Sequence, residues 1–370
     1  MAFLHAHSCE CLKSELELFT VPPTQATIEN SQWIHYKPIS SLTDDSPIEF
    51  VVPGQGEEYV DLPHTMLHMC VQIRPTVYKK KTKVVTEASK SSDVTDNLVG
   101  PVNNFMHSLF NQVDIFFNQK LVSPPNNAYA YRAYIETLLN YGPAAKNSHL
   151  TSVMWYEDTS GAMTKFDLNQ GFVKRHSLTS NNKKLDLMGH LHCDVFNQER
   201  FLINGVEMRL QMVRSRDSFC LMDKTEQNFE VHILDATLLV RRSKISPGIL
   251  LAHAKALSKT TAKYPLTRVE VKSISIHSGI YGETLDNVIL GQIPKRLIIG
   301  FVDNKAFNGN RKLNPFNFHH YKINYLSLYV DGKQIPSKPL QPDFTKENLY
   351  MDAYHTLFSG TELKCVSKKR

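Results

Sequence analysis

Two stretches of the chain follow the same pattern, and this repeat decides the predicted fold. The first reads Val113-Asp-Ile-Phe-Phe-Asn-Gln-Lys-Leu-Val122, followed by a Ser-Pro-Pro-Asn-Asn loop and then Tyr131-Arg-Ala-Tyr134. The second reads Leu326-Ser-Leu-Tyr-Val-Asp-Gly-Lys-Gln-Ile335, followed by a longer proline-rich loop and then Met351-Asp-Ala-Tyr354. Each copy predicts an alternating strand, a tight turn that ends in lysine, a short return strand and a helix.

Apolar and polar residues alternate with a period of two along most of the chain, which is the pattern of half-buried β-strands. The runs are short and rich in Val, Ile, Phe, Tyr and Thr, and Pro, Gly, Asn and Ser residues separate them. They span residues 48–52, 59–73, 113–117, 206–210, 236–240, 269–276, 296–302 and 325–330. Many short antiparallel strands of this kind predict a sandwich or a barrel.

Helical periodicity is sparse and lies in connecting segments. Residues 128–139 place apolar side chains on one face, and Gly142-Pro143 ends the pattern. Ser246-Pro247 predicts the start of a second helix that runs to about Ser258, and residues 347–358 predict a third. The fold class is therefore all-β with a few connecting helices.

The repeat also predicts the domain organisation. We expect an N-terminal arm at residues 1–40, a first β domain at 41–228 and a second at 229–370. Residues 61–73 also match residues 234–245 weakly. About 80 residues follow the repeated helix in the first copy but only about ten in the second. We therefore expect the second domain to lack its C-terminal strands, as in a truncated product or a fragment.

Composition excludes several classes of protein. The 370 residues are 42% hydrophobic and 21% charged, as in an ordinary globular chain, and no apolar run has the length of a transmembrane segment. The first twenty residues lack the apolar region of a signal peptide, so we expect an intracellular rather than a secreted protein. The net charge of +6 is spread out, and the Lys79–Lys83 cluster fits a solvated loop better than a basic arm on nucleic acid.

Motifs that carry catalysis are absent from the sequence. It contains no P-loop, no Gly-x-Ser-x-Gly elbow, no His-Glu-x-x-His motif and no Cys-x-x-Cys pair. We therefore expect no enzyme activity, no catalytic or cofactor-binding residues and no cofactor.

Two clusters of potential metal ligands need a separate decision. His5, His7, Cys9 and Cys11 lie within seven residues, and His190, His192 and Asp194 would share one face of a strand. The first cluster fits a surface or assembly arm, and the second fits a half-buried strand with a polar outer face. We expect no metal site at either place.

Several long stretches, spread over nearly the whole chain, carry a likeness to a known family. They are Ser8–Leu16 with Pro22–Gln25, Tyr59–Thr65, Pro101–Asn104 through Leu109–Phe110, Tyr131–Leu139, Asn204–Arg209, Asn314–Phe318 and Pro339–Phe344. In these stretches the sequence resembles the double jelly-roll major capsid proteins of Polinton/Maverick elements and adintoviruses. Members of that family continue through closing strands of the second jelly roll that this sequence does not contain.

The resemblance implies two tandem jelly-roll β-sandwiches, the second incomplete, and a structural role. A double jelly-roll subunit would form a homotrimer with a pseudo-hexagonal outline, and such trimers would tile an icosahedral shell. The implied partners are further copies of the chain and a minor or penton capsid protein, with no sequence-specific nucleic acid. The implied location is the virion capsid, after assembly in the cytoplasm or nucleus.

Three other interpretations stay open at this stage. A carbohydrate- or peptide-binding sandwich would need a concave aromatic patch, to which Trp33 and Trp155 could contribute. A metal-dependent enzyme would be built on His190, His192 and Asp194. The chain could also be a genome-resident relic of a capsid gene that no longer assembles.

Overall fold

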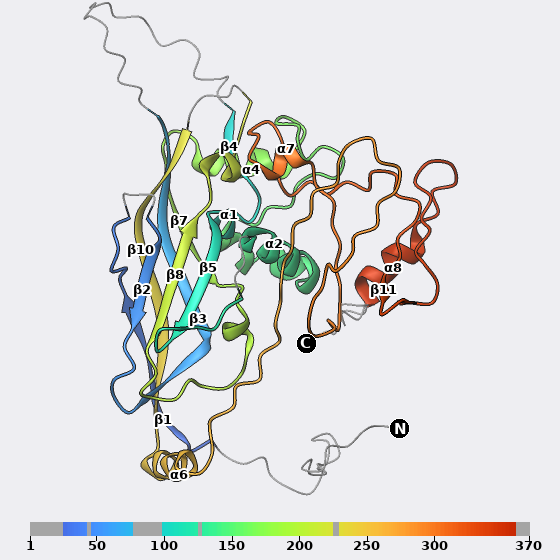
Figure 1. Cartoon of the computed structure of the whole chain (residues 1–370). Coiled ribbons are helices and arrows are strands. Elements are labelled where there is room, and N and C mark those ends of the chain that lie inside the picture. Colours follow the sequence, from blue (N-terminus) through green and yellow to red (C-terminus); the bar gives the residue numbers. More distant parts are fainter. Residues whose placement is uncertain (1–24, 43–45, 77–97, 125–127, 225–228, 360–370) are drawn as a thin grey trace, which may run out of the picture.

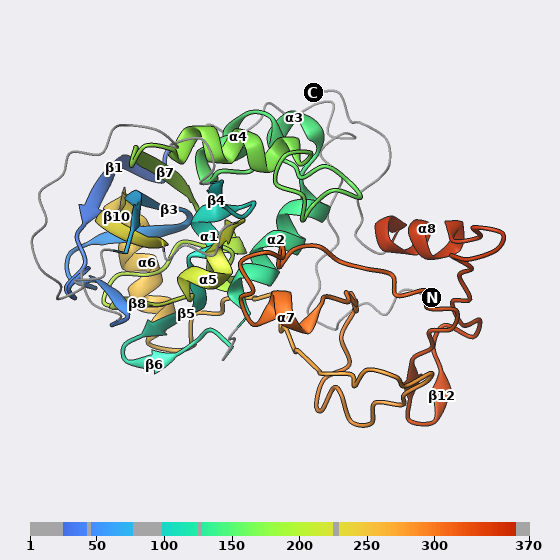
Figure 2. The same ribbon diagram turned by 90° about the horizontal axis from the view of Figure 1, so that it is seen from above.

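A computed structural model describes residues 25–42, 46–76, 98–124, 128–224 and 229–359. The described chain is mostly β with a few connecting helices, as the sequence predicts. A β-sandwich forms its body, and the later part of the chain lies beside this sandwich (Figures 1 and 2). The His5 to Cys11 cluster and Lys79–Lys83 fall outside the described residues.

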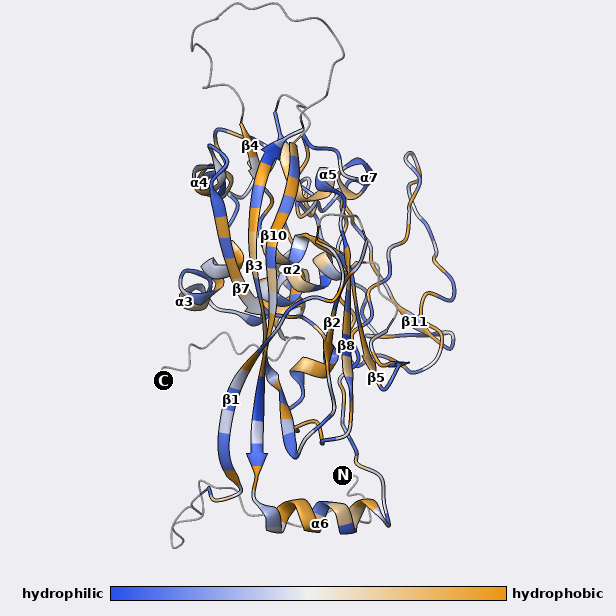
Figure 3. Ribbon diagram, turned by 90° about the vertical axis from the view of Figure 1, so that its left-hand side faces the viewer, coloured by the Kyte–Doolittle hydropathy of each residue, from blue (hydrophilic) through white to orange (hydrophobic). Residues whose placement is uncertain are grey.

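Two four-stranded antiparallel sheets make the sandwich (Figure 3). In the first sheet the order is β1 (Ile28–Tyr36), β10 (Phe229–Ile245), β3 (Glu58–Pro75) and β7 (Lys184–His190). In the second sheet the order is β2 (Ile48–Val52), β8 (Met208–Arg214), β5 (Phe110–Phe117) and β6 (Lys120–Leu121). The short strands β4 (Val99–Pro101) and β9 (Leu221–Asp223) pair separately.

The predicted alternation places the core between the two sheets. Along β3, Leu67, Met69, Val71 and Ile73 are buried, and the residues between them are more exposed. Ile48, Phe50 and Val52 of β2 and Met208, Leu210 and Met212 of β8 form the facing layer. Because full burial of such a side chain contributes roughly 1.5–3 kcal/mol, this alternation fixes which face of each strand turns inward.

Most helices lie in connections between strands, and the last one follows the final strand of the chain. The larger ones are α2 (Tyr129–Asn140), α4 (Gln170–Thr179), α6 (Pro247–Leu257) and α8 (Met351–Ser359). The first, third and fourth of these correspond to the three helices predicted from the sequence. The shorter ones are α1 (Phe105–Ser108), α3 (Pro143–Lys146), η2 (His149–Val153), η3 (Asp194–Asn197), α5 (Asp217–Cys220) and α7 (Asn304–Phe307).

The internal repeat is confirmed at the level of local structure. The strands β5 and β6 form a hairpin followed by α2, and β11 (Tyr329–Val330) and β12 (Lys333–Gln334) form a hairpin followed by α8. Both turns use two residues with positive φ: Asn118 at 45° and Gln119 at 67°, then Asp331 at 48° and Gly332 at 76°. Two-residue hairpin turns with positive φ at both positions match the twist of the flanking strands.

Two predicted strands are wrong for the described chain. Residues 269–276 and 296–302 alternate in sequence, yet they contain no named strand, and Val302 makes only an isolated bridge to Phe318. The physical reason is that a strand needs a neighbour for its backbone groups, and the described residues supply none here.

The structure also shows how the predicted segments join. β1, which lies inside the predicted arm, pairs with β10, and β10 pairs with β3. The weakly matching segments 61–73 and 234–245 are thus adjacent strands of one sheet. Division of the chain at residues 41–228 and 229–370 stays a prediction.

Candidate functional site: residues 303–318 docked on helix α2

Residues 303–318, called here the docking segment, connect the later part of the chain to the sandwich. The segment contains α7 and the sequence Asn314-Pro-Phe-Asn-Phe318, one of the stretches that carry the family resemblance. Ala306, Asn314 and Phe316 are fully buried although they lie in a part of the chain that is otherwise largely exposed. This burial shows that the docking segment packs against the sandwich and so attaches the later part of the chain to it.

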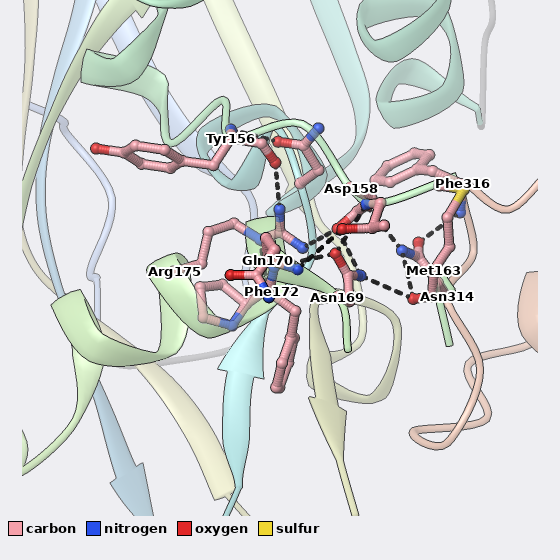
Figure 4. A network of polar contacts seen from close by, with 12 residues as sticks. Tyr156, Asp158, Met163, Asn169, Gln170, Phe172, Arg175, Asn314 and Phe316 are labelled. Atoms are coloured by element: carbon pink, nitrogen blue, oxygen red, sulfur yellow. Dashed lines mark hydrogen bonds and ion pairs between the residues drawn. The ribbon is translucent and has the colours of Figure 1, made fainter. Parts of the chain in front are cut away.

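A buried carboxylate organises the polar half of the contact (Figure 4). Asp158 accepts hydrogen bonds at Oδ1 from Arg175 Nη2 at 2.5 Å and from Asn169 Nδ2 at 2.8 Å. Its Oδ2 accepts from Asn314 Nδ2 at 2.9 Å. Because both oxygens are occupied and a cation neutralises the charge, burial of Asp158 is compensated.

Helix α4 places Arg175 and Asn169 at this point. Asn169 is the N-cap of the helix and its side chain accepts from the backbone N–H of Phe172 at 3.3 Å. Arg175, one and a half turns later, is completely buried and also donates to the carbonyl oxygens of Pro101, at 2.9 Å, and Tyr156. The guanidinium therefore joins β4 to the loop after η2, and Asp158 of that loop in turn binds Asn314 of the docking segment.

Stacked aromatic rings make the apolar half of the contact. Tyr131 and Tyr134 lie three residues apart on α2 and so share one helix face. Phe316 stacks on Tyr134 with ring centroids 4.2 Å apart, and Phe307 stacks on Tyr131 at 5.6 Å. Tyr131 also donates its hydroxyl proton to the carbonyl of Pro315 at 3.1 Å. Burial raises the pKa of both tyrosines, so both stay neutral.

A second charged cluster lies on the other side of α2. Arg132 donates to Asp194 at 2.6 Å and to Glu136 at 2.9 Å, and His192 Nδ1 lies 2.7 Å from the second Glu136 oxygen. Burial would raise the pKa of Glu136, but the hydrogen bond to His192 and the charge of Arg132 outweigh it, so this pKa lies below its usual value.

This second cluster also reaches the later part of the chain. The Asp194 carboxylate accepts from the backbone N–H of Val269 at 3.3 Å, and its other oxygen lies 3.8 Å from Arg268 Nε. Helix α2 therefore contacts the docking segment directly through its two tyrosines, and the start of the later part indirectly through the Arg132–Asp194 pair.

The structure separates the predicted metal-ligand cluster. The expectation that His190, His192 and Asp194 share one strand face is wrong, because strand β7 ends at His190. His190 Nδ1 lies 3.2 Å from the carbonyl of Thr65, while the other two face Glu136 and Arg132. Within the described residues no three His, Cys, Asp or Glu side chains gather as metal ligands.

The two tryptophans do not form one surface. Trp155 is 1% exposed and packs on Tyr134 inside the core, whereas Trp33 is 43% exposed on β1. A concave aromatic platform for a carbohydrate cannot use both of them. The cavity beside Tyr129, Arg132 and His192 measures about 10 Å³, room for one water molecule and too little for a substrate.

Sequence reasoning did not find the Asp158 network. Asp158, Asn169 and Arg175 belong to no recognisable motif and to none of the strands or helices predicted from the sequence. Asn314 was available as a signal, because it begins one of the stretches that carry the resemblance.

Comparisons with known proteins find remote similarities. No protein-family model matches the chain. An uncharacterised protein of Caenorhabditis elegans is 27% identical over 339 residues, which make up 90% of this chain and 77% of the relative. A chain in the structure of the Sputnik virophage is 11% identical with a TM-score of 0.43, over 66% of this chain and 54% of that one. The Faustovirus major capsid protein is 10% identical with a TM-score of 0.40, over 65% of this chain and 58% of that one. The chain thus spans little more than half the length of these two solved structures.

Proposed function

We propose that this chain is a major capsid subunit that associates as a homotrimer, the building block of an icosahedral shell. The sequence resemblance supports this role, and the confirmed hairpin-and-helix repeat supports the two related halves that a double jelly roll requires. In this role the subunit has no turnover, it binds further copies of itself and a minor capsid protein, and it resides in the virion.

The observation that carries the proposal is an exposed apolar surface between α6 and the docking segment. Large apolar side chains there reach solvent in the single chain, and some of them belong to the alternating runs 269–276 and 296–302. They are Ile274, Ile276, Ile280, Leu285, Ile289, Leu290, Ile293, Leu297, Ile298 and Ile299. Apolar surface on this scale marks a binding site for another protein, and unpaired strand-forming segments pair readily with another chain.

Both ends of this apolar stretch are held on the sandwich by contacts within the chain. Residues 268–269 hold one end on Asp194, and the docking segment holds the other end on Tyr131 and Tyr134 of α2. The position of the apolar stretch relative to the sandwich is therefore fixed at both of its ends. Burial of this stretch against a neighbouring copy would remove apolar area from water, which is the main favourable term in association.

Light scattering after gel filtration tests the proposal on the full chain. A homotrimer of 42.2 kDa chains has a mass of about 127 kDa, and that mass is the expected result. A stable monomer at micromolar concentration would contradict the proposal.

A pair of matched variants locates the contact. Ile299→Lys adds a charge to the exposed apolar surface, and we expect it to shift the trimer towards monomer. Leu168→Lys makes the same change at an equally exposed position, 53% against 49%, outside this surface, and should leave the mass unchanged. Equal loss of trimer in both variants would show that the surface is not the contact.

A further inference from the structure

Helix α6 lies across one end of the sandwich, at the bottom of Figures 1 and 3. It follows β10 directly, begins with Pro247 in its first turn and ends at Leu257, with Ser258 as its C-cap. Proline is favoured in a first turn, since its missing N–H would have no partner there. The helix runs crosswise to the strands, so its whole length faces outward from the end of the molecule.

The exposure of α6 does not match its composition. Seven of its eleven residues are Ile, Leu or Ala, at positions 249–252, 254, 256 and 257, yet no residue of the helix is buried. His253 faces the sandwich, where its Nδ1 lies 2.9 Å from the hydroxyl of Tyr59. Leu251 is 74% exposed on the outer side, one turn before Lys255. An apolar helix of this kind needs a further surface to cover it.

Charge identifies the chemistry of that surface. Residues 244–269 contain five lysines and arginines and one histidine but no aspartate or glutamate. Lys244 is paired with Glu29 at 3.2 Å. Lys255, Lys259 and Lys263 have no ion pair within the described residues. A second copy of this helix would bring like charges together, so self-pairing is disfavoured, whereas a surface of negative charge is complementary.

We propose that α6 is an interfacial helix that binds the surface of an anionic lipid bilayer. Leu251 and the neighbouring apolar side chains would enter the boundary between headgroups and acyl chains, and the lysines would lie at the level of the phosphates. Eleven residues give about 16 Å of helix, roughly half the hydrocarbon thickness, so the helix lies in the interface. No helix in the described part of the chain is long and apolar enough to cross a bilayer. Nucleic acid would use the lysines but would leave Leu251 uncovered.

Flotation of the full chain with vesicles tests this proposal. The probes are vesicles of phosphatidylcholine alone and of phosphatidylcholine with 30% phosphatidylserine, at about 0.1 M salt. We expect binding to the anionic vesicles only. Both Leu251→Ser and the double variant Lys255→Glu with Lys259→Glu should weaken that binding by about tenfold or more. Light scattering on each variant shows whether its fold and oligomeric state are intact, which separates this test from that of the capsid role.

A charge-matched control makes the result specific. Lys174→Glu with Lys184→Glu changes the net charge equally at exposed positions on α4 and β7, and should leave vesicle binding unchanged. Failure of the wild-type chain to float, or equal loss in the control, overturns the proposal. Binding to a DNA oligonucleotide that depends on Lys255 and Lys259 but not on Leu251, without vesicle binding, overturns it in favour of a nucleic acid surface.

Discussion

Phe316 lies flat on Tyr134, with ring centroids 4.2 Å apart and planes inclined by only 3°. The two residues are 182 positions apart in the sequence, and each belongs to a stretch that carries the family resemblance. Their contact joins the repeated helix of the sandwich to the segment that holds the later part of the chain. The stability of this contact therefore determines whether the exposed apolar surface keeps its position on the sandwich.

Replacement of Phe316 by alanine should release the docking segment. Removal of a fully buried phenylalanine costs about 3–5 kcal/mol, because the ring loses its contacts and leaves a cavity. We expect a lower urea midpoint by circular dichroism and faster proteolytic cleavage within residues 303–318. Tyr321→Ala, at an exposed position, is the control and should behave like the wild type. Unchanged cleavage of Phe316→Ala would show that other contacts hold the segment.

Replacement of Asp158 by asparagine tests the buried charge network. Arg175 is completely buried, and without its carboxylate it becomes an uncompensated cation. Breaking such a pair from one side costs about 3–5 kcal/mol in the free energy of unfolding, measured by chemical denaturation. The exposed Asp167→Asn change removes the same charge nearby and should cost little. A similar loss in both variants would mean that net charge, and not the network, matters.

Reactivity of the cysteines provides a third test. Burial raises the pKa of the Cys193 thiol to about 12, and although the Arg132 charge lowers it, burial prevails. Burial likewise raises the pKa of Cys220. Because the thiolate is the reactive form, we expect iodoacetamide at pH 8 to modify half-buried Cys70 before either of them. Peptide mapping by mass spectrometry distinguishes the three sites, and early modification of Cys193 in the folded protein would contradict the structure.

The fold was predictable wherever a segment with strand or helix periodicity also has a neighbouring element to pack against or pair with. The alternation in β2, β3 and β5 and the helical face of α2 follow from nearby residues, so those elements match. Residues 269–276 and 296–302 alternate equally well but form no named strand, since pairing depends on a neighbour that periodicity does not reveal. The Asp158 network was not predictable, because its members are 156 positions apart and burial alone gives them their role.

Acidification should weaken the fold through His107, which is completely buried beside Tyr129 and the ring of His192. Burial, helped by the charges of His192 and His190, lowers the pKa of His107 well below its usual 6.5. The unfolded chain therefore binds more protons below pH 6.5, and the free energy of unfolding falls as the pH drops through that value. Glu136, whose pKa is also lowered, adds its own loss only at more acidic pH, below its usual 4.5. We expect the urea midpoint of the wild type to fall between pH 7.5 and about 5.5. His107→Gln should reduce that dependence, whereas the exposed control His319→Gln should retain it. An identical pH dependence in all three proteins would exclude His107 as its source.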